Sequence, residues 1–192
     1  MTRGGGLNQS VAVDTYGNVY TTGSFYGTID FDPGTGVSNL TSNGAYDIFI
    51  QKLDANGNFL WVKQMVSFFY GSAGTSIAVD AQGNVYTTGY FQDSVDFDPG
   101  TGVHNLTSNG EDDIFILKLN SNGNLLWVKQ MGGVDGDIGA SINLDASGNV
   151  YTIGHFSYIV DFDPGAGVSN LFSYGFSDVF IQKLDTNGNF VW

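Results

Sequence analysis

The chain repeats one pattern three times, and this repetition limits the folds it can adopt more than any other feature. The segment GNVY recurs at intervals of 66 and 65 residues, with glycines at 17, 83 and 148. The same spacing separates the prolines of three DFDPG segments (33, 99, 164) and the only tryptophans, Trp61, Trp127 and Trp192. The sequence therefore predicts three copies of one unit: 1–64, 65–130 and 131–192, the third with a truncated outer strand.

The residues within each copy favour β-structure. The chain has 28 glycines and a single glutamate, Glu111, and its other strong helix formers are scarce. An aspartate followed three residues later by glycine closes a compact hairpin, and this device occurs at Asp14–Gly17 and again at Asp54–Gly57. We expect four strands in the first copy, at 9–14, 18–25, 47–53 and 58–65, with equivalents in the others.

Both faces of these strands are apolar, so each sheet is expected to be covered on both sides. Ile48 and Ile50 point one way, and Phe49 and Leu53 the other. Four-stranded antiparallel sheets that repeat and need neighbours on each face are what a propeller blade requires. The predicted fold class is all-β, with three four-stranded antiparallel blades of a partial β-propeller. A β-trefoil, which also has three four-stranded repeats, is the alternative.

Taken together, the motifs resemble a known repeat family. The segments SIAVDAQGNVYTTGYF, DFDPG, NLTSNG, DDIFILKL and NGNLLWVKQMGG are similar to the bacterial β-propeller repeat called SBBP. This resemblance covers essentially the whole chain and implies radially arranged blades in secreted or surface-attached bacterial proteins, with no established catalytic residues. Closed propellers have about four to eight blades. We therefore expect further blades of a longer chain or, less favoured, a second copy that completes a six-bladed ring.

Charge and hydropathy limit which binding partners and which cellular locations are expected. The chain has nineteen acidic and six basic residues, giving a net charge of -13. Nucleic acid is not an expected partner, because phosphate binding needs clustered lysine and arginine. No apolar run is long enough to span a bilayer. Met1-Thr2-Arg3 begins no signal peptide, so the expected extracellular or cell-surface location requires an export signal outside this chain.

Paired aspartates in the DFDPG segments are the candidate metal ligands. Two carboxylates flank a phenylalanine and would project to one side of an extended segment, an arrangement that suits calcium. The favoured alternative is that the second aspartate begins a Pro-Gly turn while the phenylalanine fills the core. No cofactor other than calcium is expected. The candidate ligands are Asp30, Asp32, Asp96, Asp98, Asp161 and Asp163.

The segments that join successive copies are the candidate ligand face. They vary strongly between copies, and loops held on a rigid scaffold are where binding residues usually lie. The favoured alternative is that the loop sequences vary without a binding role and the aromatic side chains pack on the neighbouring blade. The candidates are Phe68, Phe69 and Tyr70 in one joining segment and Asp135 and Asp137 in the next.

The sequence argues against catalysis. His104 and His155 occupy unrelated repeat positions, no cysteine is present, and the six paired aspartates share near-identical contexts. A glycosidase pair needs two carboxyl groups in different environments. We therefore expect a non-catalytic platform or spacer of an exported bacterial protein, with adhesion or binding of a protein or glycan as its role. The alternative is the non-catalytic or substrate-binding part of a larger surface hydrolase.

Overall fold

The computed structural model describes residues 5–192, and within that range the protein is all-β. Seventeen strands form antiparallel sheets, none of which is closed, and no helix occurs among the described residues. No described segment is therefore a helix long and apolar enough to cross a membrane. The start of the first predicted copy, including Met1-Thr2-Arg3, lies outside the described residues.

Each copy of the repeat contributes one main sheet, and we call these sheets units 1, 2 and 3. Their strands follow one another in space as they do in the chain, apart from the short hairpins described below. Unit 3 has three strands, and its chain end adds an isolated bridge between Phe190 and Leu184. The predicted boundaries after residues 64 and 130 fall inside β6 and β12. The strands are β1 (Gly5–Val13), β2 (Val19–Tyr26), β5 (Asp47–Leu53) and β6 (Phe59–Ser67) in unit 1; β7 (Ala73–Val79), β8 (Val85–Phe91), β11 (Asp113–Leu119) and β12 (Leu125–Met131) in unit 2; and β13 (Ile138–Leu144), β14 (Val150–Phe156) and β17 (Asp178–Leu184) in unit 3.

Short hairpins that the sequence did not predict lie between the second and third strands of each unit. They are β3–β4 (Thr28–Asp30, Asn39–Thr41), β9–β10 (Ser94–Asp96, Asn105–Thr107) and β15–β16 (Ile159–Asp161, Asn170–Phe172). In unit 2 the hairpin also reaches back to its neighbour, because Val66 of β6 pairs with Asp96 of β9. The β9–β10 hairpin thus adds a backbone link between units 1 and 2, whereas β3–β4 and β15–β16 form separate two-stranded sheets.

The Asp-to-Gly turns form as the sequence predicts, and both turns of a unit share one end of the sheet. The Asp14 carboxylate accepts the amides of Tyr16 and Asn18 at 2.9 Å, and Gly17 has a φ of 81°. A Cβ on Gly17 would lie 3.0 Å from the Cβ of Ala55, in the second turn of the same unit. We call this the turn end.

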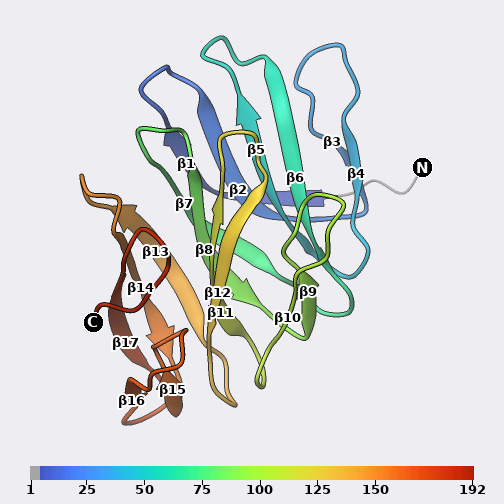
Figure 1. Cartoon of the computed structure of the whole chain (residues 1–192). Coiled ribbons are helices and arrows are strands. Elements are labelled where there is room, and N and C mark those ends of the chain that lie inside the picture. Colours follow the sequence, from blue (N-terminus) through green and yellow to red (C-terminus); the bar gives the residue numbers. More distant parts are fainter. Residues whose placement is uncertain (1–4) are drawn as a thin grey trace.

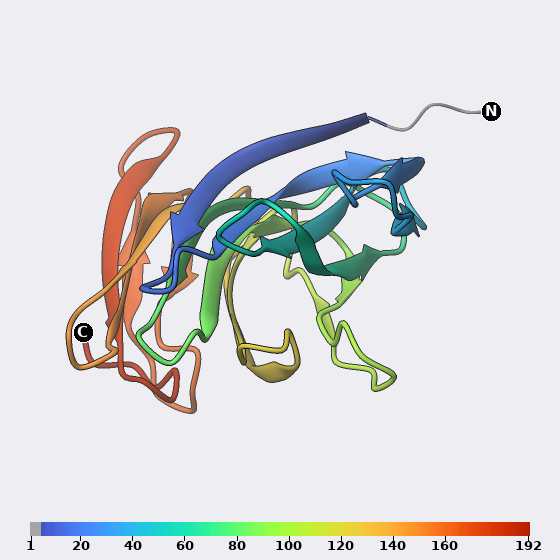
Figure 2. The ribbon, with the colours of Figure 1, turned by 90° about the horizontal axis from the view of Figure 1, so that it is seen from above.

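The units stack face to face in chain order, and the core lies between them. In Figure 1 the colours pass from blue through green and yellow to red across the stack, and Figure 2 shows the same succession from above. One apolar cluster joins unit 1 to unit 2 and contains Tyr20, Ile48, Ile50 and Met65 of the first. A second cluster joins unit 2 to unit 3 through the equivalent side chains, namely Tyr86, Ile114, Ile116 and Met131.

Lysine and tryptophan side chains tie each unit to the next at the turn end. Lys52 Nζ lies 3.5 Å and Trp61 Nε1 3.3 Å from the backbone oxygen of Ser121, to which both donate. The next junction repeats this arrangement, because Lys118 and Trp127 donate to the oxygen of Thr186 at 3.1 and 3.3 Å. The lysine and tryptophan therefore recur in the sequence because each copy uses them to hold the next one. The recurring residues are Lys52, Lys118, Trp61 and Trp127.

Candidate binding surface

The end of the stack opposite the turn end brings together two segments of unit 1: the long connection between β2 and β5 (27–46) and the loop that joins unit 1 to unit 2 (68–72). Tyr46 and Gly71 form a parallel β-bridge, and the amide of Ser72 donates to the Tyr46 oxygen at 3.2 Å. A Cβ on Gly44 would lie 2.8 Å from the backbone oxygen of Ser67. We call this surface the loop end.

Aromatic side chains gather on the loop end where unit 1 meets unit 2. Phe68, Phe69 and Tyr70 are exposed, and Phe69 keeps 72% of its accessible surface. Beside this segment, Tyr26 and Tyr46 are also exposed and make an edge-to-face contact with ring centroids 5.3 Å apart. We call these five residues the aromatic group. Tyr26 and Tyr46 were not among the sequence candidates, although their equivalents in unit 2 are Gln92 and Asp112, and this difference marks them as variable.

The corresponding part of the next junction is acidic. Asp135 and Glu111 are exposed, whereas Asp137, a predicted ligand-face residue, is buried. The Asp137 carboxylate accepts the amides of Gly133 at 2.7 Å and Ser157 at 2.9 Å, so it holds the joining loop to unit 3. Burial raises the pKa of Asp137 in spite of these hydrogen bonds.

Asp113 is the most perturbed carboxyl group at this junction. Burial, together with the nearby charges of Asp137 and Asp112, raises its pKa to about 6, although Gln130 and the Asn109 amide donate to it. Its Oδ1 atom is buried and has no hydrogen-bond partner. In unit 1 the equivalent Asp47 has partners on both oxygens, because the Ser67 amide donates to Oδ1 at 3.1 Å. The junction between units 2 and 3 is therefore sensitive to protonation.

The paired aspartates of the DFDPG segments fold their own loop in all three units. Asp30 Oδ1 accepts the amides of Asp32 at 3.0 Å and Ser38 at 2.8 Å, and Asp32 Oδ1 accepts the Gly34 amide at 2.7 Å. These hydrogen bonds lower the pKa of Asp30. The turn interpretation thus has direct contacts in each copy. The same bonds recur at Asp96 and Asp98 and at Asp161 and Asp163.

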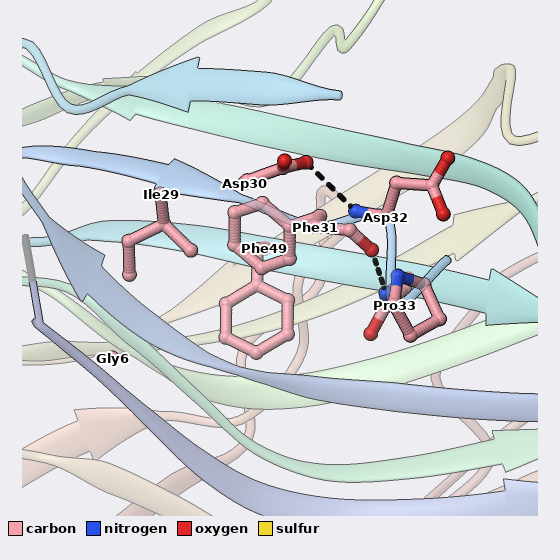
Figure 3. A pocket seen from close by; sticks show the side chains of 8 residues that line it. Gly6, Ile29, Asp30, Phe31, Asp32, Pro33 and Phe49 are labelled. Atoms are coloured by element: carbon pink, nitrogen blue, oxygen red, sulfur yellow. Dashed lines mark hydrogen bonds between the residues drawn. The ribbon is translucent and has the colours of Figure 1, made fainter. Parts of the chain in front are cut away.

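The phenylalanine between each aspartate pair is buried, as the turn interpretation requires. In unit 1 Phe31 packs against Phe25 and Phe49, with ring centroids 5.4 and 4.9 Å apart. Figure 3 shows Phe31 and Phe49 side by side in a pocket of about 320 Å³, with Asp30 and Asp32 next to them. In units 2 and 3 the matching phenylalanines are buried in clusters that include Met65 and Met131 of the preceding unit.

Residues 5–192 contain no group of three or more histidine, cysteine, aspartate or glutamate side chains arranged to hold a metal ion. Two carboxylates per site, with oxygens already bonded to amides, leave a calcium ion dependent on backbone oxygens and water. Calcium binding at these pairs remains a prediction from the sequence.

The comparisons with known proteins found distant relatives. No family model matches the chain. An uncharacterized WD repeat-containing protein of Acanthamoeba polyphaga mimivirus is 28% identical over 86% of this chain, which covers 13% of that protein. The regulatory protein FlaEY of Caulobacter vibrioides is 28% identical over 58% of the chain and 12% of its own length. A solved protein of unknown function from Bacteroides caccae aligns with a TM-score of 0.31 and 13% identity, over 98% of this chain and 81% of its own.

Proposed function

We propose that these units are consecutive blades of a β-propeller of the SBBP type, and that the segment is a non-catalytic platform whose loop end binds a protein or glycan. The boundaries of the three blades are those given by the repeat. The WD-repeat relative supports a β-propeller-like repeat fold. The sheet order supports blades over a trefoil, because the main strands of each unit form a simple antiparallel meander.

One observation carries the binding role: the units are alike at their junctions and differ at the loop end. Thr22, Ile48 and Ile50 of unit 1 have the fully buried counterparts Thr88, Ile114 and Ile116 in unit 2. At the loop end, one junction carries the aromatic group, whereas the next carries the acidic residues Glu111, Asp112 and Asp135. A scaffold that repeats while its loops diverge presents an asymmetric recognition surface.

The chemistry of this surface suits a ligand with both apolar faces and hydrogen-bonding groups. Exposed aromatic rings provide flat contact area at low entropic cost, and neighbouring carboxylates accept hydrogen bonds from hydroxyl or amide donors. A role at the bacterial surface, outside the cell, agrees with this chemistry and with the resemblance to the repeat family.

Ligand capture tests the proposal. The protein is immobilised and exposed to bacterial surface extracts and to a glycan array, beside a variant that carries Phe69→Ala and Tyr70→Ala. We expect binding that the double variant loses by at least tenfold. Val168→Ala, on an exposed loop of unit 3, is the matched control and should bind as the parent does. Capture that is equal for all three proteins would contradict a ligand site at the aromatic group.

A further inference from the structure

The lysine side chains of the described chain all reach the turn end, which keeps their positive charge away from the loop end. Two of them donate to backbone oxygens of turns in the next unit. Lys183 lies 4.0 Å from Asp145, in the first turn of its own unit. A Cβ added to Gly123 of a unit 2 turn would lie 2.5 Å from Lys63 Cε, and a turn of unit 3 meets Lys129 in the same way. The described residues include no arginine and five lysines, namely Lys52, Lys63, Lys118, Lys129 and Lys183.

The loop end carries the opposite charge, next to exposed aromatic rings. Glu111 and Asp135 are exposed at the junction between units 2 and 3, and Asp112 is half-buried beside Glu111. Burial and the charge of Glu111 raise the pKa of Asp112. Because every described lysine reaches the turn end, none neutralises these three carboxylates. The loop end therefore attracts positively charged ligands.

A small pocket at the loop end, between units 1 and 2, links the aromatic group to these carboxylates. Tyr46 of the aromatic group and Tyr90 of β8 both line it, and its volume is about 180 Å³. Pockets that hold a whole small molecule measure roughly 300–1,000 Å³, so this one suits a single side chain. Burial and the charge of Asp112 raise the pKa of Tyr90, which shows that this carboxylate acts on the pocket wall.

The walls of this pocket suit a cation on a flexible apolar stem. Aromatic rings attract ammonium and guanidinium groups through the negative charge of their faces. Gln9 and Ser24 add oxygen atoms that can accept hydrogen bonds, and the exposed Leu7 can pack against methylene groups. No described residue that lines the pocket carries a charge of its own.

The paired rings belong to one junction. The repeat equivalents of Tyr46 and Tyr90 at the junction between units 2 and 3 are Asp112 and His155. One junction therefore provides rings around a pocket, and the next provides carboxylates.

We propose that the pocket receives a lysine or arginine side chain of a protein partner, whose neighbouring basic residues face Glu111, Asp112 and Asp135. This deepens the proposed function, on which it rests, and selects a basic protein segment over a glycan. A neutral sugar would stack on the rings but leave the carboxylates without charged partners, and an anionic ligand would be repelled.

Fluorescence anisotropy tests the proposal with a fluorescein-labelled peptide of alternating lysine and glycine, at low ionic strength. The same peptide with acetylated lysine side chains is the ligand control, because acetylation removes the charge and keeps the chain. We expect the lysine peptide to bind, the acetylated peptide to bind about tenfold more weakly or less, and added sodium chloride to weaken the binding.

Variants of the full chain separate the pocket from the general attraction of an acidic protein. Tyr46→Leu removes a ring but no charge and should raise the dissociation constant about fivefold, whereas Tyr46→Phe keeps the ring and should bind as the parent does. Asp112→Asn should raise the dissociation constant about threefold. Asp54→Asn, at the turn end, is the matched control, because Asn120 already makes the same turn contacts in unit 2. Circular dichroism confirms that each variant is folded.

Four results would overturn the proposal: no binding of the lysine peptide, equal binding of the acetylated peptide, equal weakening by Tyr46→Leu and Asp54→Asn, or a Tyr46→Phe variant as weak as Tyr46→Leu. The third would mean that net charge alone attracts the peptide, and the fourth that the ring face is not the contact. Ligand capture that depends on Phe69 and Tyr70, without binding of the lysine peptide, would leave the platform role standing. A lysine peptide that binds while extracts and glycans do not would do the reverse, so the two proposals fail independently.

Discussion

Gly74 shows how a single residue sets the distance between two sheets. The position has no special backbone angle, yet a side chain there would meet Thr22 of the preceding unit. We predict that Gly74→Ala lowers the free energy of unfolding by about 1–3 kcal/mol, the usual cost of overpacking. Urea denaturation measures the change.

A second substitution separates this contact from a local effect on β7. In a double-mutant cycle, Thr22→Ala should recover part of the loss caused by Gly74→Ala, because it removes the atom that a new methyl group would meet. Gly136→Ala is the matched control, since its nearest neighbour would be the flexible end of Glu111 at 3.6 Å. Strict additivity of the two changes would show that the contact does not set the spacing.

Asp113 makes stability depend on pH. Its pKa is raised to about 6 from an ordinary value of 3.8, so the folded protein binds its proton more tightly than the unfolded chain does. The contribution of Asp113 to stability is therefore greatest below about pH 4 and is lost as the pH rises through 6. We predict that Asp113→Asn removes this pH dependence and raises the free energy of unfolding at pH 7. The expected gain is about 1–3 kcal/mol, because one pKa unit corresponds to about 1.36 kcal/mol.

Urea denaturation at several pH values tests the role of Asp113. Asp93→Asn, at a partly exposed aspartate whose charge acts on neither Asp113 nor Asp137, is the control and should keep the pH profile of the parent. A parent whose stability is flat between pH 4 and 6 in this comparison would contradict the prediction.

At the scale of elements, the equivalent tryptophans Trp127 and Trp192 can be compared, because one donates to the next unit and the other serves as its control. Trp127→Phe keeps the ring against Tyr86 but removes the N–H that donates to the Thr186 oxygen. We predict a loss of about 0.5–1.5 kcal/mol, the net value of one hydrogen bond. Trp192→Phe should cost less, because no following unit accepts its N–H within the described chain. Thermal unfolding compares the two variants, and equal losses would contradict the inter-unit role.

The hairpin loops give a prediction about calcium. Asp96→Ala removes the acceptor of the Asp98 and His104 amides, and we expect it to cost about 1–2 kcal/mol. Because the carboxylates already bond backbone amides, the melting temperature of the parent should not change in millimolar calcium or EDTA. A rise with calcium that Asp96→Ala abolishes would instead establish the metal site, by linkage of binding to folding.

The strands of unit 1 show what the sequence could and could not predict. The expected strands at 18–25 and 47–53 correspond to β2 and β5, because runs of β-favouring residues bounded by Asp-to-Gly turns mark them locally. The three-residue strands β3 and β4 were missed, since so short a run carries no strand pattern of its own. The donors Lys52 and Trp61 were not linked to Ser121 either, because these contacts join residues 69 and 60 positions apart and leave no local pattern.

The same limit applies to the candidate binding surface. Phe68, Phe69 and Tyr70 are exposed, as a ligand-face role requires. Asp137 is buried because it binds the Gly133 and Ser157 amides, a contact set by the stacking of units 2 and 3. Tyr26 and Tyr46 come together only when the long connection folds back beside the sheet. Variation between copies was the one sequence signal for these positions.

At the scale of the whole molecule, electrostatics acts against folding. The net charge is -13, and a single ion pair is formed among the described residues, between Lys183 and Asp145 at 4.0 Å. Repulsion among the carboxylates therefore outweighs attraction, and folding into a compact shape increases this repulsion. Salt shortens the Debye length from about 14 Å at 0.05 M to about 4 Å at 0.5 M, which weakens this repulsion.

We therefore predict that the melting temperature rises by several degrees when sodium chloride increases over this range, since about 1 kcal/mol corresponds to roughly 2–4 °C for a domain of this size. Differential scanning calorimetry at pH 7 measures the effect. Sodium chloride rather than sulfate is used, because sulfate also strengthens apolar burial. A variant with exposed acidic residues replaced by their amides, such as Glu111→Gln with Asp135→Asn, should start at a higher melting temperature and gain less from salt. A melting temperature that falls with salt would mean that attractive pairs, and not repulsion, dominate the charge interactions of the stacked sheets.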